Sequence, residues 1–395
     1  MAERRHLYEI DLMRAFIMLC VLSVHTTSFF NSMNFDYTFP FVSMGALITT
    51  LHYTREGFFF ITGLVLFVTY YHRPFRTLQF WKKRFTLIVV PYLAFNAIYV
   101  LSGYLFAPNV TWSWAGIWRT WWTSVATGHQ WFLYYVLVSM QLYIVFPLLL
   151  KGLRKFERYQ LYILIGSFIF QLVMMWAFKF NKIPGQDLPW GLRQVYFYRD
   201  RFVLTYQFWF IAGGIMACHY DKVLAFVDRH RLALRAWLVF AILFVWAHYV
   251  FDHLVLHQPE HMADTVLQPI MIPYSLLVTA NMWYAGVQWS RRRLTPGWKP
   301  FSWFVTVASS ASFGIFLIQP LPLHYMENTI SAWQRAGNPA WLHFSLWPFC
   351  ILFVYLSSMV IAHWIGKVPI LAYIVGRKVN WPRRNAANSV TTRTA

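Results

Sequence analysis

The stretch EIDLMRAFIMLCVLSVHTTSFF, from Glu9 to Phe30, is almost wholly apolar yet contains Asp11, Arg14 and His25. Its length is close to the ~20 apolar residues with which an α-helix crosses a bilayer. Ionisable side chains inside such a span are costly, so each is a candidate functional residue. Arg14 and His25 are eleven positions apart, which on a helix means about 20° of rotation and roughly 16 Å of rise. We therefore expect both on one helix face, with Asp11 able to pair with Arg14.

The composition of the whole chain is that of a membrane protein. Of its 395 residues, 58% are hydrophobic and only 12% are charged, about half the charge of a soluble domain. The formal net charge of +20 falls in clusters between apolar segments, as the positive-inside rule expects, and this argues against nucleic-acid binding. Cys20, Cys218 and Cys350 lie in or beside apolar segments without metal-type spacing, so we expect reduced thiols and no metal site.

These segments predict an all-α membrane protein, a polytopic bundle of about ten transmembrane helices with both termini cytoplasmic. With this topology, 25 of the 34 basic residues lie in inner segments and seven in outer ones, which supports the count. The first segment carries charges and has no small-residue cleavage pattern, so we expect an uncleaved span. We expect residues 1–378 to form the membrane domain and 379–395 a polar cytoplasmic tail. The predicted spans are 9–31, 41–70, 85–107, 130–150, 160–180, 203–220, 235–252, 267–289, 301–325 and 343–374.

A second group of ionisable residues lies in the second predicted span, in HYTREGFFFITG from His52 to Gly63. His52 is four positions before Glu56, on the same face of a continuous helix. Buried charges must be paired, so Arg55 and Glu56 are either a structural ion pair or part of a site. His25 is similarly either a buried neutral histidine bonded to a neighbouring helix or a general base. Arg14 is either an interfacial cation or an anion-binding group.

The predicted outer segments are rich in aromatic residues. One cluster precedes the fourth span, and it is either an interfacial helix of the aromatic belt or a platform for sugar rings. The outer loop from Asn181 to Arg201 ends in YFYRDR and either binds a glycan or caps the bundle. The aromatic cluster that precedes the fourth span consists of Trp112, Trp114, Trp118, Trp121 and Trp122.

The arrangement I-D-x-x-R-A followed by His25 resembles the opening helix of the acyltransferase-3 family of multi-pass membrane acyltransferases. Four later stretches resemble further family landmarks in the same order. Gln319 stands where the family usually has a histidine, so we give Gln319 no catalytic role. The chain looks most similar to the shorter members found with intercellular-adhesin (poly-N-acetylglucosamine) clusters. The four stretches that resemble later family landmarks are Glu56, Phe58, Phe59, Thr62 and Gly63 (acidic-x-Phe-Phe-x-x-Ser/Thr-Gly), and the segments 80–92, 128–150 and 309–321.

The resemblance implies an integral-membrane O-acyltransferase of a bacterial cell membrane. Such an enzyme moves an acetyl or succinyl group from cytoplasmic acyl-CoA to a hydroxyl of an extracytoplasmic glycan or lipid-linked sugar. Acyl-CoA is then a donor substrate, and we expect no bound cofactor and no metal. The lipid bilayer is the other expected partner, and nucleic acid is not one.

The same resemblance suggests roles for individual residues. His25 takes the acceptor proton or transiently carries the acyl group, and Glu56 orients or balances the imidazole. Arg55 stabilises the oxyanion, and we place His129 and Trp131 with Arg14 and Arg55 in the substrate site. For the CoA phosphates we expect Arg14, Lys83 and Arg84, although basic residues are also common at any anionic membrane surface.

Two other classes of function fit parts of the sequence. A polysaccharide exporter would share the many spans, but it would be expected to show internal repeats with broken helices at matched positions. We find no such repeat in the sequence. A sensor or scaffold with a degenerate site would fit the departure at Gln319, whereas the intact Arg14 and His25 argue against it.

Overall fold

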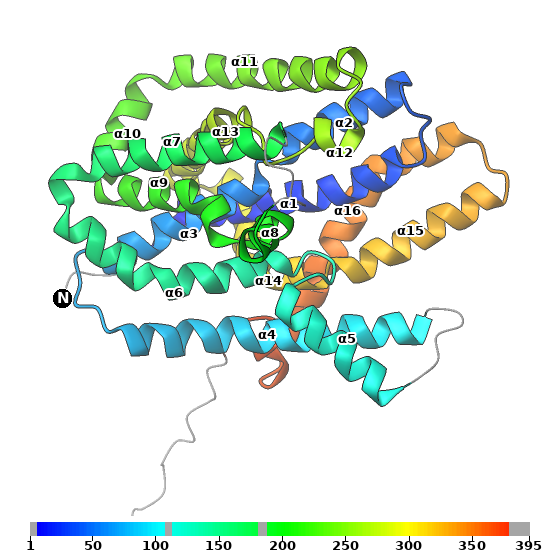
Figure 1. Cartoon of the computed structure of the whole chain (residues 1–395), viewed down its shortest axis with the longest axis horizontal. Coiled ribbons are helices and arrows are strands. Elements are labelled where there is room, and N and C mark those ends of the chain that lie inside the picture. Colours follow the sequence, from blue (N-terminus) through cyan, green and yellow to red (C-terminus); the bar gives the residue numbers. More distant parts are fainter. Residues whose placement is uncertain (1–5, 107–112, 181–187, 379–395) are drawn as a thin grey trace, which may run out of the picture.

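A computed structural model describes residues 6–106, 113–180 and 188–378 (Figure 1). These residues form helices and no strand, which confirms the predicted all-α fold. The helices are α1 (Tyr8–Asn31), α2 (Phe39–Leu51), α3 (Thr54–Tyr70), α4 (Thr77–Phe106), α5 (Trp114–Thr127), α6 (Tyr134–Lys155), α7 (Gln160–Lys179), α8 (Trp190–Phe197), α9 (Gln207–Cys218), α10 (Tyr220–Arg229), α11 (Arg231–Val250), α12 (Glu260–Ala263), α13 (Met271–Arg292), α14 (Lys299–Ile318), α15 (Pro320–Arg335) and α16 (Ala340–Ile365). Shorter turns are η1 (Glu157–Tyr159), η2 (Arg199–Arg201), η3 (Val203–Tyr206), the π-helical η4 (Phe251–Val255), η5 (Pro296–Trp298) and η6 (Leu371–Tyr373).

Seven helices of the described chain are long and apolar enough to cross a membrane, so the protein is a polytopic membrane protein. The number is eight if Val203–Cys218 and Tyr220–Arg229, which are bent by 94° at a break, form one span. Seven of the ten predicted spans correspond to these helices, and the span 203–220 corresponds to the bent pair. The predicted spans 41–70 and 267–289 do not meet the criterion of length and hydropathy. The first is broken between α2 and α3, and the second is α13, which contains polar residues such as Asn281 and Gln288. Ten spans therefore stay a prediction.

The connections between helices gather at two opposite ends of the bundle (Figure 1). The α3–α4 and α6–α7 connections lie at one end, whereas the α1–α2 and α15–α16 connections lie at the other. The predicted topology likewise puts the first two connections on one side of the membrane and the last two on the other. His6 and Arg377, close to the two ends of the described chain, line one cavity, which agrees with termini on the same side. The predicted tail 379–395 lies outside the described residues.

The long second span predicted from the sequence is broken in the structure. Helix α2 ends at Leu51, and α3 begins at Thr54, so His52 and Tyr53 form the joint. His52 bonds through Nδ1 to the backbone carbonyl of Asp264, 2.8 Å away and 212 positions later in the chain. Because this contact is long-range, the break has no local sequence signal. It places His52 on a joint instead of on the same helical face as Glu56.

Helices α3 and α9 pack with their backbones in close contact at two glycines. A Cβ atom on Gly63 would lie 2.2 Å from the carbonyl oxygen of Phe210, and one on Gly213 would lie 2.1 Å from that of Phe60. Small residues allow this close approach of membrane helices. Gly63 therefore serves the packing that holds α3, and with it Arg55, in position.

A buried ion pair ties the C-terminal end of α7 to the segment between α11 and α13. Lys179 Nζ lies 2.6 Å from Asp252 Oδ2 and 2.5 Å from the carbonyl oxygen of Met262. Asn31 at the end of α1 donates to Glu260 Oε1 over 2.6 Å. These contacts hold α12 and its neighbours against the C-terminal ends of α1 and α7.

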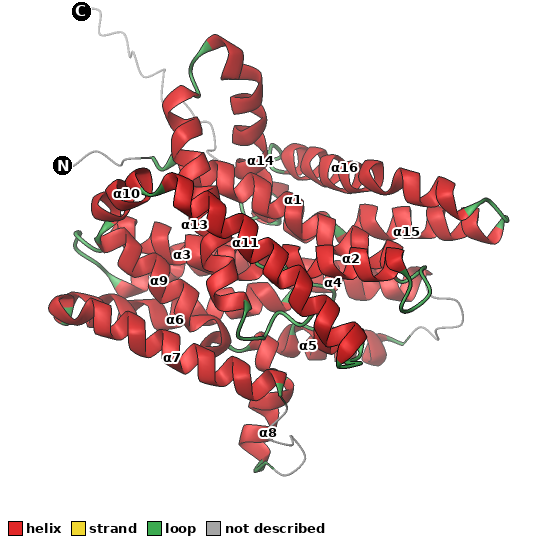
Figure 2. Cartoon of the chain, turned by 90° about the horizontal axis from the view of Figure 1, so that it is seen from above, coloured by secondary structure: helices red, strands yellow, loops and turns green. Residues whose placement is uncertain are grey.

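Two aromatic helical regions extend beyond the central bundle. Helices α15 and α16 lie side by side and project at the end that carries the α1–α2 connection (Figure 2). Helix α5 exposes Trp114, Trp118 and Trp122, which recur every fourth residue on one face. This spacing favours the interfacial-helix interpretation of the tryptophan cluster; Trp112 lies outside the described residues. The three cysteines are free, as expected.

Candidate active site

A cavity of about 220 Å³, which we call the histidine cavity, lies between α1, α3 and α6. His25 comes from the C-terminal half of α1, and His52 comes from the α2–α3 joint. Arg55 from the first turn of α3 lines the same cavity. Two imidazoles and a guanidinium thus share a small space whose other walls are largely aromatic.

His25 is positioned by an aromatic ring instead of a hydrogen bond. Its ring stacks on Phe132, with centroids 3.5 Å apart and planes inclined by 15°. None of the described residues forms a hydrogen bond with His25, so the alternative of a histidine bonded to a neighbouring helix is not what this fold shows. Neither ring nitrogen is thus occupied by a described hydrogen-bond partner, and the residue lines the histidine cavity.

Arg55 and Glu56 diverge even though they are adjacent in sequence. Arg55 donates to the Tyr206 hydroxyl over 3.4 Å, and its guanidinium lies 5.5 Å from the ring centre of Tyr134. Glu56 is fully buried, and neither carboxyl oxygen has a hydrogen-bond partner among the described residues. No described ion pair joins these two residues, and Glu56 does not line the histidine cavity. The roles we expect for Glu56 and Arg55 stay predictions.

A second cavity, of about 570 Å³, opens on the other side of the aromatic wall and is called the inner cavity here. Phe58, Tyr135 and Phe316 line both the inner and the histidine cavity. The inner cavity is cationic, because Arg14, Arg84 and Arg377 all contribute to its lining. Three rings thus separate a positively charged space at the inner end of α1 from the space that contains His25.

Arg14 lies between the inner cavity and a neighbouring one of about 400 Å³, which also includes Lys83 and Arg84. The expected pair with Asp11 does not form. Asp11 instead accepts from Ser309 Oγ over 2.8 Å and lies 2.6 Å from His6 Nε2. Among the described residues, none forms an ion pair with Arg14, and its positive charge faces both cavities.

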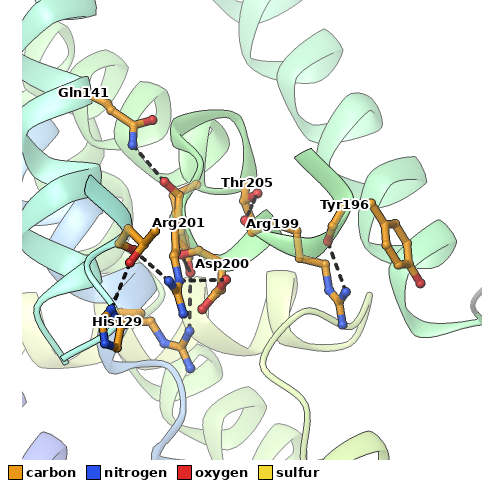
Figure 3. A network of polar contacts seen from close by, with 10 residues as sticks. His129, Gln141, Tyr196, Arg199, Asp200, Arg201 and Thr205 are labelled. Carbon is orange, nitrogen blue, oxygen red and sulfur yellow. Dashed lines mark hydrogen bonds and ion pairs between the residues drawn. The ribbon is translucent and has the colours of Figure 1, made fainter. Parts of the chain in front are cut away.

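Arg55 also lines a cavity of about 300 Å³ together with Arg199 and Asp200, which we call the outer cavity after the predicted topology. Its rim is the segment that ends in YFYRDR, and Figure 3 shows how this segment is held. Gln141 donates to the Arg201 carbonyl over 2.8 Å, and Arg201 donates to the Thr127 carbonyl over 2.7 Å. The segment is therefore held against α6 and the end of α5, and its Arg199 and Asp200 line the outer cavity. Of the loop's earlier part, residues 181–187 lie outside the described residues.

Neither His129 nor Trp131 lines the histidine cavity. His129 Nδ1 is 3.0 Å from Thr127 Oγ1 (Figure 3), and partial burial together with the charge of Arg201 lowers its pKa. Trp131 lines a separate side cavity of about 1010 Å³ with His324 and Tyr325. It is 6.1 Å, centre to centre, from Phe132, the ring that stacks on His25. A bulky ligand in the side cavity would thus lie two aromatic rings away from His25.

The protein is thus an integral-membrane helical bundle. Its histidine cavity lies between the cationic inner cavity and the polar outer cavity. The chain belongs to the acyltransferase-3 family, because the model of the family's acyltransferase domain matches residues 7–363. The protein is therefore a membrane acyltransferase. No curated protein and no solved structure matches the chain.

Several residues of the site could not be selected from the sequence. Phe132, Tyr135 and Phe316 form walls that only the packing of α1 against α6 and α14 creates. Arg377 reaches the inner cavity from the far end of the chain and donates to Ser310 over 3.0 Å. No three or more His, Cys, Asp or Glu residues of the described ranges form a group that could hold a metal ion.

Proposed function

We propose that the enzyme transfers a small acyl group from acyl-CoA at the cytoplasmic side to a hydroxyl of a carbohydrate on the outer side. The observation that carries this proposal is the succession of cavities. The inner and histidine cavities share Phe58, Tyr135 and Phe316, and the histidine and outer cavities share Arg55. Donor and acceptor can thus approach His25 from opposite sides.

The donor end of this arrangement suits a phosphorylated thioester. CoA carries phosphates at one end and the thioester at the end of an extended pantetheine arm. Arg14, Arg84 and Arg377 supply cations for the phosphates, and charge-assisted bonds of arginine to phosphate are among the strongest in proteins. The roughly 16 Å of helix rise between Arg14 and His25 is of the order of that arm's length. Lys83 belongs to the same cationic region.

The reacting groups are those of the histidine cavity. His25 takes the acceptor proton or carries the acyl group. Arg55, which has no described carboxylate partner, stabilises the negative charge that develops on the acyl oxygen, and the N-terminus of α3 adds to this potential. Glu56 is one residue further along α3, and we propose that its buried carboxyl group tunes the charge of this site.

The size of the histidine cavity favours a short acyl group. About 220 Å³ accommodates an acetyl or succinyl group but not a long fatty acyl chain. The same size disfavours the alternative of a polysaccharide exporter, because a sugar chain would have to pass between Phe58, Tyr135 and Phe316. On the acceptor side, the Arg199 and Asp200 side chains of the outer cavity suit the hydroxyl groups of a carbohydrate.

The test is acyl release and transfer by purified enzyme with acetyl-CoA, succinyl-CoA and palmitoyl-CoA. We expect turnover of one of the short donors, none of palmitoyl-CoA, and a loss of at least 100-fold in His25→Ala, since positioned acid–base groups contribute at least that factor. His343→Asn is the matched control, because His343 is buried in α16 and lines none of the cavities described above. Equal turnover by His25→Ala and the control would contradict the assignment of His25.

A further inference from the structure

His52 is held in one tautomer by the fold. Its Nδ1 lies 2.8 Å from the backbone carbonyl oxygen of Asp264. A carbonyl oxygen only accepts, so Nδ1 must carry the proton. In the neutral ring the other nitrogen, Nε2, then has a free lone pair. This is how a general base is oriented in a catalytic triad, where a partner on Nδ1 leaves Nε2 facing the substrate.

The carbonyl that orients His52 is itself fixed. Asp264 directly follows α12, which Asn31 anchors through Glu260 over 2.6 Å. Lys179 holds the carbonyl of Met262 over 2.5 Å while it pairs with the buried Asp252. Contacts from α1 and α7 thus fix the segment in front of His52.

His52 and His25 line the same cavity, but only His52 has a polar partner. His25 stacks on Phe132 and lines the cavity, and no hydrogen bond to its ring nitrogens is made by the described residues. A nucleophile must expose a nitrogen to the acyl carbon, whereas a base must present a lone pair to a proton. The two environments match these two tasks.

We propose that His52 is a second catalytic histidine, which takes the proton of the acceptor hydroxyl while His25 carries the acyl group. This rests on the acyl transfer proposed above. In the first step, a nitrogen of His25 bonds to the acyl carbon, the C–S bond breaks, and the CoA thiolate takes the proton that His25 loses. In the second step, the acceptor oxygen bonds to the acyl carbon and its proton passes to Nε2 of His52. The C–N bond breaks, and His52 returns the proton to the freed nitrogen of His25, which restores both neutral rings.

The decisive variant is His52→Asn. The Asn side-chain amide nitrogen occupies about the position of Nδ1, so it keeps the bond to the Asp264 carbonyl while the basic Nε2 is removed. Two quantities are measured, with His343→Asn as the control. One is the single-turnover release of CoA without acceptor, and the other is acyl transfer to the acceptor. We expect His52→Asn to release about one equivalent of CoA, as the wild type does, and to lose at least 100-fold in transfer.

Other outcomes separate this proposal from the one on which it rests. Transfer by His52→Asn within about fivefold of the wild type would overturn the role of His52, because the variant preserves the structural bond. Loss of CoA release together with transfer, in a variant whose thermal unfolding is unchanged, would overturn the division of roles. Retention of both activities by His25→Ala would instead overturn the proposed function.

Discussion

The ring of His25 stacks on that of Phe132 with the two centroids 3.5 Å apart, and none of the described residues forms a hydrogen bond with His25. We therefore expect Phe132→Ala to lower kcat by a factor of about 3 to 10, because an aromatic pair contributes about 0.5–1.5 kcal/mol beyond its buried area. The KM for acyl-CoA should not change. Phe349→Ala, which truncates an exposed ring on α16, is the control. Equal kcat values for the two variants would remove Phe132 from the site.

Arg14 is predicted to bind the donor through its phosphates. Arg14→Ala should raise the KM for acyl-CoA by roughly 10- to 100-fold, since a hydrogen bond between charged groups contributes about 1.5–3 kcal/mol, and should leave the acceptor KM unchanged. An acyl-pantetheine donor without phosphates should be used equally well by variant and wild type. Arg231→Ala, at an exposed position on α11, serves as the control. If Arg14 is only an interfacial cation, donor kinetics will be unaffected.

The glycine contact between α3 and α9 makes a prediction about stability. In Gly213→Ala the new methyl group would meet the Phe60 carbonyl oxygen at 2.1 Å, so the helices must separate, at a cost of about 1–3 kcal/mol or more. We expect a lower thermal unfolding temperature in detergent. Gly152→Ala in α6 adds the same methyl group where no atom lies within 4 Å. That variant should be as stable as the wild type, and an equal loss in both would contradict the packing argument.

Asp264 gives a prediction for pH. Burial and the nearby Glu260 raise the pKa of its carboxyl group to about 7. The folded state therefore binds more protons than the unfolded state, and this group destabilises the fold increasingly as pH rises towards 7. Asp264→Asn removes the ionisable group but keeps the backbone carbonyl that bonds His52. The stability advantage of the variant in thermal unfolding should be larger at about pH 8 than at about pH 5, with acyl transfer unchanged. An advantage that is the same at both values would show that the carboxyl group does not titrate in this way.

The first helix was predictable because its information is local. The apolar run from Glu9 to Phe30 and the spacing of Arg14 and His25 are properties of one helix, and α1 covers Tyr8–Asn31. The family membership also followed from such local motifs. The possible Asp11–Arg14 pair does not form, because Asp11 instead contacts His6, five positions before it, and Ser309, which is 298 positions away. Local spacing allows a contact, but tertiary packing decides between the candidates.

The positions of His52, Phe132 and Arg377 in the site were not predictable from the sequence, because they depend on tertiary packing. The stretch from 41 to 70 is long for one span, which allows a kink, but its residues do not place the joint at His52 and Tyr53, where His52 contacts the distant Asp264. The break moves His52 away from Glu56 and into the cavity that holds His25. Phe132 and Arg377 are ordinary residues in the sequence, and their positions depend on how α1 meets α6 and the end of the chain.

The central claim is that an acyl group crosses from a donor on the cytoplasmic side to an acceptor on the outer side through His25. The measurement is made with sealed vesicles of known orientation, with radiolabelled acetyl-CoA or succinyl-CoA on one side and a glycan acceptor on the other. We predict label on the acceptor only when the donor is on the cytoplasmic side, and none with His25→Ala. Label that appears only when donor and acceptor share one side, or transfer that does not depend on His25, would contradict the account.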